Sequence, residues 1–388
     1  MSAPTPFASK IHHHFLRLSE HQVIVSNNER QILDLIRRNS VESRADLVQA
    51  TGLSAQSIMR LVDELVTRGF LKFGAAAIPK GRGKPSLAVT LVPEFAYSFG
   101  ISIYTDAIAF ALIDFSGAVI AQRYVAISPI TQESLVENVK KQLASMIKDS
   151  NLDPAKLFGV GVGMTGYFVG QGSKLNPPAL LDDLALVELD QLLARELGYP
   201  VWLDNDGNVA AIGESLLGVG KWAENFAYLY FSHGFGGGIV LNNQCFRGAH
   251  GNAGEFASML AMQGLERPTL ESLRVMLVND GLNIPDIASM ISVFDPTWPA
   301  IERWITMITP GLSRVVSATL AIFDPDAIVL GGRIPAALAQ RLIPHIQMDD
   351  ISRRGHQRPQ SSIVLAEAPS DTTAIGAAAL PFKEHFFL

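Results

Sequence analysis

Apolar residues repeat at helical spacing near the start of the chain. After Asn28, whose side chain can cap a helix, one apolar face is formed by Ile32, Leu33, Leu35 and Ile36. The same spacing predicts two further helices, a short one over residues 43–50, with Leu47 and Val48 facing inward, and a longer one over residues 55–68.

A glycine turn separates the second and third predicted helices. Gly52 can end the second helix and Ser54 can cap the third. The inward face of the third helix is formed by Ile58, Leu61, Val62 and Leu65. Two strands follow, joined by the basic loop Gly81-Arg82-Gly83-Lys84-Pro85. Helix, short helix, turn, helix and basic hairpin are together typical of a winged helix-turn-helix.

This pattern predicts contact with double-stranded DNA. The early turns of the third helix would enter the major groove, where Gln56 can bond an adenine edge and Arg60 can reach guanine or phosphate. The basic loop would lie in the minor groove, which attracts Arg and Lys. The predicted DNA-binding residues are Ser54, Gln56, Ser57, Arg60, Arg82 and Lys84. A three-helix protein-interaction module with a charged loop is the alternative.

Beyond Pro93 the pattern changes to alternating strands and helices. Strands are predicted over residues 99–111, 119–127, 158–164, 201–203, 226–231, 239–241 and 326–330, helices over 133–148 and 186–197, and a glycine turn over 232–238. This order favours two α/β halves that face each other across a cleft. We therefore divide the chain into an N-terminal arm (1–27), a DNA-binding domain (28–92) and a sensing domain (93–388).

Composition and charge agree with this division. Of the 388 residues, 48% are hydrophobic and 18% charged, which suits large buried cores. Residues 1–90 carry 12 basic and 7 acidic side chains, whereas the rest carries 19 and 30, so a basic head precedes an acidic body. We expect a cytoplasmic protein with no membrane span, because we find neither a long apolar run nor an apolar signal core.

Cys245 is the only cysteine in the chain. An intramolecular disulfide and a cysteine-based zinc cluster are therefore both excluded. We interpret His12-His13-His14 as part of a solvated arm and expect neither a metal site nor a cofactor.

Four ordered motifs in the body resemble the ROK family of repressors, open reading frames and sugar kinases. They are Asn205-Asp206-Gly207-Asn208 with Glu214, the glycine hairpin from Gly236 that leads to Ala253-Gly254-Glu255, Asp324-Pro325 with Gly331-Gly332, and Ile375-Gly376-Ala377-Ala378. The resemblance implies an α/β fold: an N-terminal winged helix-turn-helix plus a two-lobed, actin-like or sugar-kinase-like (ribonuclease H-like) domain.

The resemblance also implies a sugar-binding cleft. Asn205 and Asp206 would hold sugar hydroxyls, Asp206 standing at the position of the kinases' general base. Glu255 and Glu271 would accept from hydroxyls, and Gly166 and Asn176 would line the same cleft. Asn205 and Asp206 have an alternative role as caps of the following helix, and Asp114 and Glu214 look like scaffold positions.

The chain departs from the family's kinases at both phosphate loops and at the zinc site. Ser102-Ile103-Tyr104-Thr105-Asp106 stands where Asp-x-Gly-Gly-Thr is expected, and Ser232-His233-Gly234 replaces Gly-Thr-Gly. Phosphoryl transfer depends on positioning and charge compensation, so these changes argue against ATP use. Ser258 occupies the position of a zinc-ligating His, and residues 259–272 contain no cysteine.

The resulting prediction is a non-enzymatic transcriptional regulator, a repressor or an activator, controlled by a sugar or sugar derivative. It would bind a two-fold operator as a homodimer or higher homo-oligomer. Two alternatives remain open here, an active sugar kinase fused to a DNA-binding head and a regulator controlled by a protein partner.

Overall fold

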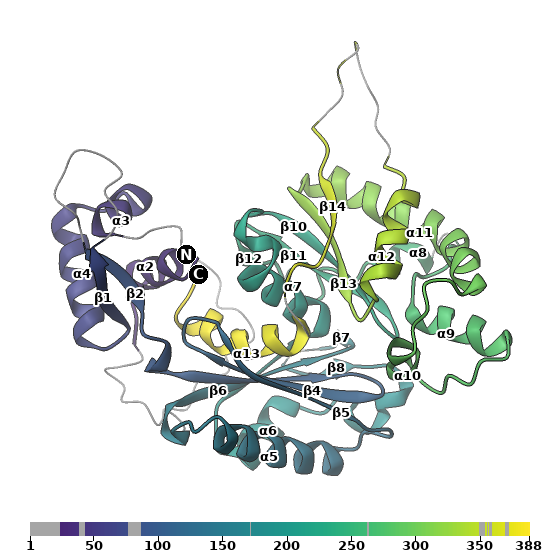
Figure 1. Ribbon diagram of the computed structural model, residues 1–388, viewed down its shortest axis with the longest axis horizontal. Helices are drawn as coiled ribbons and strands as arrows, with labels where there is room; N and C mark the ends of the chain where they lie inside the picture. The colour runs from purple at the N-terminus through teal and green to yellow at the C-terminus, as the bar shows by residue number, and fades with distance from the viewer. Residues whose placement is uncertain are drawn as a thin grey trace.

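The computed structural model describes residues 24–38, 43–76, 87–170, 172–261, 264–348, 354, 356, 359–368 and 372–388. A small head lies at one end, and two lobes face each other with helices between them (Figure 1). The predicted basic loop, with Arg82 and Lys84, lies outside the described residues, as does the arm up to residue 23.

The head has the predicted three helices and a two-stranded antiparallel sheet. They are α2 (Asn27–Arg37), α3 (Arg44–Thr51), α4 (Ala55–Thr67), β1 (Leu71–Ala76) and β2 (Leu87–Leu91). Gly52 ends α3 with φ +70°, and Ser54 caps α4, as predicted. The predicted cap Asn28 is wrong, because Ser26 forms a capping box with Glu29 and α2 begins at Asn27.

Lobe I contains a five-stranded mixed sheet of order β5-β4-β3-β6-β9. Its strands are β3 (Tyr97–Ile103), β4 (Ala107–Asp114), β5 (Val119–Ala126), β6 (Leu157–Met164) and β9 (Val201–Asn205). Helices α5 (Gln132–Asp149) and α6 (Leu189–Leu197) cover its outer face (Figure 1). The predicted helix over 186–197 is shorter because Leu186 has φ +60°, which is incompatible with a helix.

Lobe II repeats this topology in the order β12-β11-β10-β13-β14. Its strands are β10 (Phe226–Phe231), β11 (Phe235–Leu241), β12 (Gln244–Cys245), β13 (Ala327–Gly332) and β14 (Ser362–Leu365). Its helices are α8 (Ser258–Ala261), α9 (Leu270–Asn279), α10 (Ile287–Ser292), α11 (Pro299–Phe323) and α12 (Ala336–Leu342). By length and composition α11 could cross a membrane, the one such helix in the described part of the chain, but Trp304 and Ile308 are buried in the lobe II core.

The predicted glycine turn over 232–238 is only partly right. Residues 236–238 lie within β11, and a Cβ at Gly238 would stand 2.7 Å from the carbonyl oxygen of Gly207. These glycines therefore let β11 approach the next helix closely instead of bending the chain.

Two helices lie between the sheets, α7 (Asp206–Leu217) and α13 (Thr372–His385) (Figure 1). Beyond α13, Phe386 packs against Phe70 of the head at a ring distance of 5.6 Å. Arg30 of α2 donates from Nε to the Phe387 carbonyl at 3.0 Å and from Nη2 to the Lys383 carbonyl at 3.0 Å. The core between the lobes is thus continuous with the core of the head.

Candidate ligand-binding site

A cavity of about 450 Å³ opens where the carboxyl ends of β6, β9 and β10 meet. Ligands in α/β proteins commonly bind at this edge of a sheet. Its lining mixes polar and apolar groups and comes from both lobes: Thr165, Gly166, Tyr167, Asn176, Asn205, Asp206, Tyr230, Ser232, His233, Gly234, Gly236, Glu255, Arg267 and Thr269, with Pro177, Pro178, Phe235 and Ala257.

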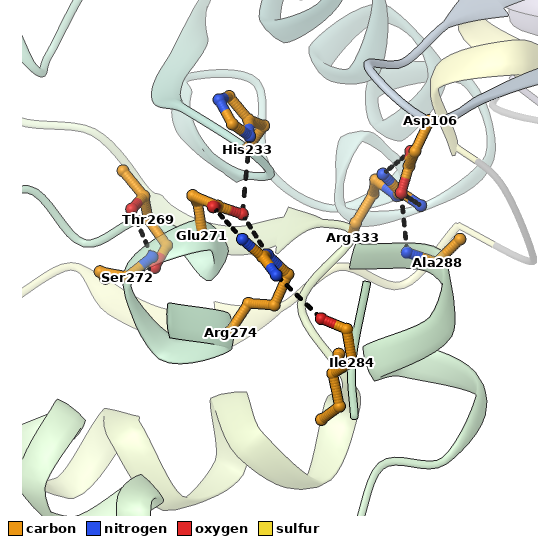
Figure 2. A network of polar contacts seen from close by, with 9 residues as sticks. All are labelled: Asp106, His233, Thr269, Glu271, Ser272, Arg274, Ile284, Ala288 and Arg333. Carbon is orange, nitrogen blue, oxygen red and sulfur yellow. Dashed lines mark hydrogen bonds and ion pairs between the residues drawn. The ribbon is translucent and has the colours of Figure 1, made fainter. Parts of the chain in front are cut away.

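Five of the six predicted sugar-binding residues line this one cavity, namely Gly166, Asn176, Asn205, Asp206 and Glu255. The structure does not bring the sixth, Glu271, into the lining. Its carboxylate accepts hydrogen bonds from Nε of Arg274 at 2.7 Å and from Nη2 of Arg274 at 2.6 Å (Figure 2). The Glu271 carboxylate also lies 3.8 Å from Nδ1 of His233, which does line the cavity.

Asn205 caps the helix that follows it, which was its alternative role in the sequence analysis. Its Oδ1 accepts from the backbone N–H of Gly207 at 2.7 Å and caps α7. Its Nδ2 donates to the Gly166 carbonyl at 2.6 Å, and that glycine has φ +134°, which favours glycine. Asn205 therefore joins the end of β6 to the start of α7 at the cavity wall.

Asp206 is the most deeply buried acid of the cavity, with 5% of its surface exposed. Burial, together with the charge of Glu255, raises the pKa of Asp206 to about 7. Burial also raises the pKa of Glu255. Two carboxyl groups share a cavity here, which suits hydrogen bonding to the hydroxyls of a polyol.

This raised pKa predicts a pH-dependent stability difference. The pKa of Asp206 is 3.8 for the unperturbed side chain and about 7 when folded, so the folded state holds the proton more tightly. Its stabilising contribution is complete below pH 3.8 and is lost as the pH rises through 7, by up to about 4 kcal/mol. The melting temperature of Asp206→Asn minus that of wild type should therefore rise between pH 5 and pH 8.

Asp190 provides the control for this measurement, because it lies outside the cavity and accepts from Ser173. The rise for Asp206→Asn should exceed any change in the Asp190→Asn difference over the same pH range. A flat difference for Asp206→Asn would contradict the raised pKa.

A second polar network joins the lobes beside the cavity. Asp106, in the turn between β3 and β4, pairs with Arg333, which follows β13, at 2.6 Å (Figure 2). The sequence predicts a negative charge at Asp106 but does not identify Arg333 as its partner. Burial lowers the pKa of His233, and the negative charges of Glu271 and Asp106 act against that shift.

The candidate DNA-binding side chains on α4 lie at the head surface. Ser54, Gln56 and Arg60 are exposed, Ser57 is half-buried, and the Arg60 side chain is 72% exposed with Glu64 at 3.8 Å. Ser54 Oγ accepts from the Ser57 backbone N–H at 3.1 Å, so Ser54 also caps α4. Within the described ranges no group of three His, Cys, Asp or Glu residues could hold a metal ion.

Comparison with known proteins shows what this chain is similar to. The model of the ROK family matches residues 98–266. The xylose repressor of Bacillus subtilis is 24% identical over 79% of this chain and 82% of its own length. A beta-glucoside kinase of Listeria monocytogenes is 30% identical over 45% of this chain and 64% of its own length.

Among solved structures, a ROK family transcriptional regulator described as a homologue of the E. coli MLC protein covers 93% of this chain and 96% of its own. The two have a TM-score of 0.62 and 19% sequence identity. This likeness shows that the chain shares that protein's fold.

Proposed function

Because this chain carries a ROK family domain, we propose that it is a DNA-binding transcriptional repressor of carbohydrate metabolism genes, controlled by a sugar or sugar derivative. The observation that carries the proposal is similarity to xylose repressors over 79% of the chain, against 45% for the kinases. Residues 28–92 would contact operator DNA, and residues 93–388 would bind the effector.

The cavity supports a sugar as effector. Asp206 and Glu255 bring carboxyl groups, Asn176 an amide, and Ser232 and Thr269 hydroxyls to one open cavity. These groups suit the closely spaced hydroxyls of a carbohydrate. The volume of about 450 Å³ lies within the usual range for small-molecule sites.

We further propose that the chain does not phosphorylate its sugar. Ser102-Ile103-Tyr104-Thr105-Asp106 lacks the glycines that would let the backbone approach a phosphate. The kinase relatives keep the alternative open, and Asp206 stands at the position that the general base takes in the resembled kinases. An assay coupled to ADP release, run over a panel of monosaccharides, distinguishes the two: sugar-dependent turnover would establish a kinase.

The proposed setting is the cytoplasm, where a repressor meets its operator. We propose a homodimer or a higher homo-oligomer, because two heads related by a two-fold axis would match a two-fold operator. Light scattering of the purified chain, with and without operator DNA, measures this directly.

The first test concerns the head. A truncated chain that starts at Pro93 should not shift DNA fragments selected with the full-length protein, because it lacks α4. In the full chain, Gln56→Ala should lower the preference for the selected sequence over random DNA by about tenfold. A truncated chain that still shifts these fragments would show that the DNA contacts lie elsewhere.

Arg60 and Arg82 provide the comparison. Arg60→Ala removes an exposed cation from α4, and Arg82→Ala removes one from the predicted basic loop. The basic loop would lie in the minor groove, where base pairs are poorly distinguished, so Arg82→Ala should weaken binding with less loss of sequence preference than Gln56→Ala and should flatten the salt dependence.

A further inference from the structure

The ion pair between the lobes is well enclosed. The side chains of Arg333 and Asp106 are 6% and 5% exposed, and they come from opposite lobes. Nη1 of Arg333 donates to Oδ1 of Asp106 at 2.6 Å, and Nη2 donates to Oδ2 at 3.2 Å. Removing either partner would leave a buried charge without compensation.

The carboxylate has a third donor, and Arg333 is held in place independently of it. The backbone N–H of Ala288 donates to Oδ2 of Asp106 at 2.7 Å (Figure 2). Nη2 of Arg333 also donates to the Tyr124 hydroxyl at 3.0 Å, and the guanidinium lies 4.6 Å from the ring centre of Tyr104. The aromatic contacts would keep the guanidinium aimed at the same point if the carboxylate were absent.

A guanidinium and a backbone N–H that converge on one point are the groups proteins use to bind small oxyanions. Here Arg333 and Ala288, both from lobe II, converge on a carboxylate supplied by lobe I. Burial acts to lower the pKa of Arg333, but the hydrogen bonds that Arg333 donates to Asp106 and the charge of that carboxylate outweigh burial and hold the pKa above its ordinary value. The cation thus stays charged in its buried position.

We propose that Asp106 is an internal ligand: its carboxylate fills an oxyanion-binding site built by the guanidinium of Arg333, which the Tyr124 hydroxyl helps to hold, and the backbone N–H of Ala288. The chain itself therefore supplies the anion that bridges the two lobes beside the sugar cavity. The chemical class that the vacated site would take is a small inorganic oxyanion such as phosphate, whose oxygens can receive the same donors.

The test is chemical rescue of the full-length Asp106→Ala variant. Truncation removes the carboxylate and leaves the donors of Arg333 and Ala288 without their acceptor, so inorganic phosphate should bind to them. Added at up to about 10 mM, phosphate should raise the melting temperature of Asp106→Ala saturably, by about 2 °C or more. Wild type should not respond, because its own carboxylate occupies the site.

Two control variants separate this site from a general salt effect, with chloride added at equal ionic strength in every arm. Asp106→Ala/Arg333→Met lacks the guanidinium and should not respond to phosphate. Asp280→Ala frees the exposed Arg303, whose Nη2 donates to Oδ1 and Oδ2 of Asp280 at 2.8 and 2.6 Å, and it too should not respond. A rise confined to Asp106→Ala supports the proposal.

No rise in Asp106→Ala, or an equal rise in wild type or in either control, would overturn the proposal. If Asp106→Ala does not fold in chloride buffer, refolding yield in phosphate is compared with yield in chloride. Recovery only in phosphate, and only with Arg333 present, then supports the internal ligand, and equal yields contradict it. Because none of these readouts uses DNA or sugar, the outcome is independent of the proposed repressor function.

Discussion

The Asp206→Asn variant is expected to lose most of its effector response, with sugar affinity falling by about 10- to 100-fold. A carboxylate can accept from two adjacent hydroxyls, whereas an amide keeps one acceptor oxygen. At pH 8, above its pKa of about 7, the Asp206 carboxyl group is mostly ionised, and hydrogen bonds to a charged group contribute about 1.5–3 kcal/mol, which corresponds to that loss in affinity. Asp206 lines the cavity with 5% of its surface exposed, so little water replaces the lost interaction.

The measurement has two stages. A thermal-shift screen of monosaccharides, amino sugars, polyols and sugar phosphates first identifies the effector with wild-type protein. Calorimetry then gives its affinity for wild type, Asp206→Asn and the control Asp190→Asn, and operator binding is measured with and without effector. Operator binding without effector should be nearly the same in all three proteins, because Asp206 lies outside the head.

The size of the DNA effect follows from linkage. An effector can shift the protein between two states only by its difference in affinity for them. A tenfold change in operator affinity therefore requires about 1.4 kcal/mol of differential binding. An Asp206→Asn protein with wild-type effector affinity and an unaltered operator response would contradict the role given to Asp206.

The head could be predicted from sequence because its signals are local. A short helix needs only a cap, an apolar face and a glycine stop. Gly52 ends α3 and Ser54 caps α4, so both signals lie within three residues. The missed cap at Ser26 is instructive. Its signal, Ser26 followed three residues later by Glu29, was present in the sequence and marks a capping box.

The cavity could be predicted in part. The resemblance named Asp206 and Glu255, which the structure brings into one cavity. It did not name Tyr230, Arg267 or Thr269, which reach the cavity from segments with no motif of their own. Glu271 was expected in the lining, but Arg274, three residues along the same helix, engages its carboxylate.

The pairing of Asp106 with Arg333 had no detectable sequence signal. The two residues are 227 positions apart and lie in different lobes. Their contact depends on how the lobes pack, which in turn depends on α7 and α13 between the sheets. Local patterns carry no information on that arrangement, so only the three-dimensional structure identifies the pair.

The second large effect is expected at Gly161 in β6, beneath α13. A Cβ at Gly161 would lie 1.8 Å from the carbonyl oxygen of Ala377 and 2.7 Å from its carbonyl carbon. Both atoms belong to backbone, so neither can rotate away as a flexible side chain would. Gly161→Ala should therefore force α13 off the lobe I sheet and destabilise the protein by about 3 kcal/mol or more.

The same clash would act on the head, because α13 leads directly to Phe386 and Phe387, which contact Phe70 and Arg30. Circular dichroism melts of Gly161→Ala should show a lowered midpoint, and limited proteolysis should cleave between head and lobes faster than in wild type. Gly234→Ala is the matched control: a Cβ there meets no atom within 4 Å, so its melt should coincide with wild type. A Gly161→Ala melt that also coincides with wild type would show that α13 does not rest on β6, and the continuous core from lobe I to the head would have to be abandoned.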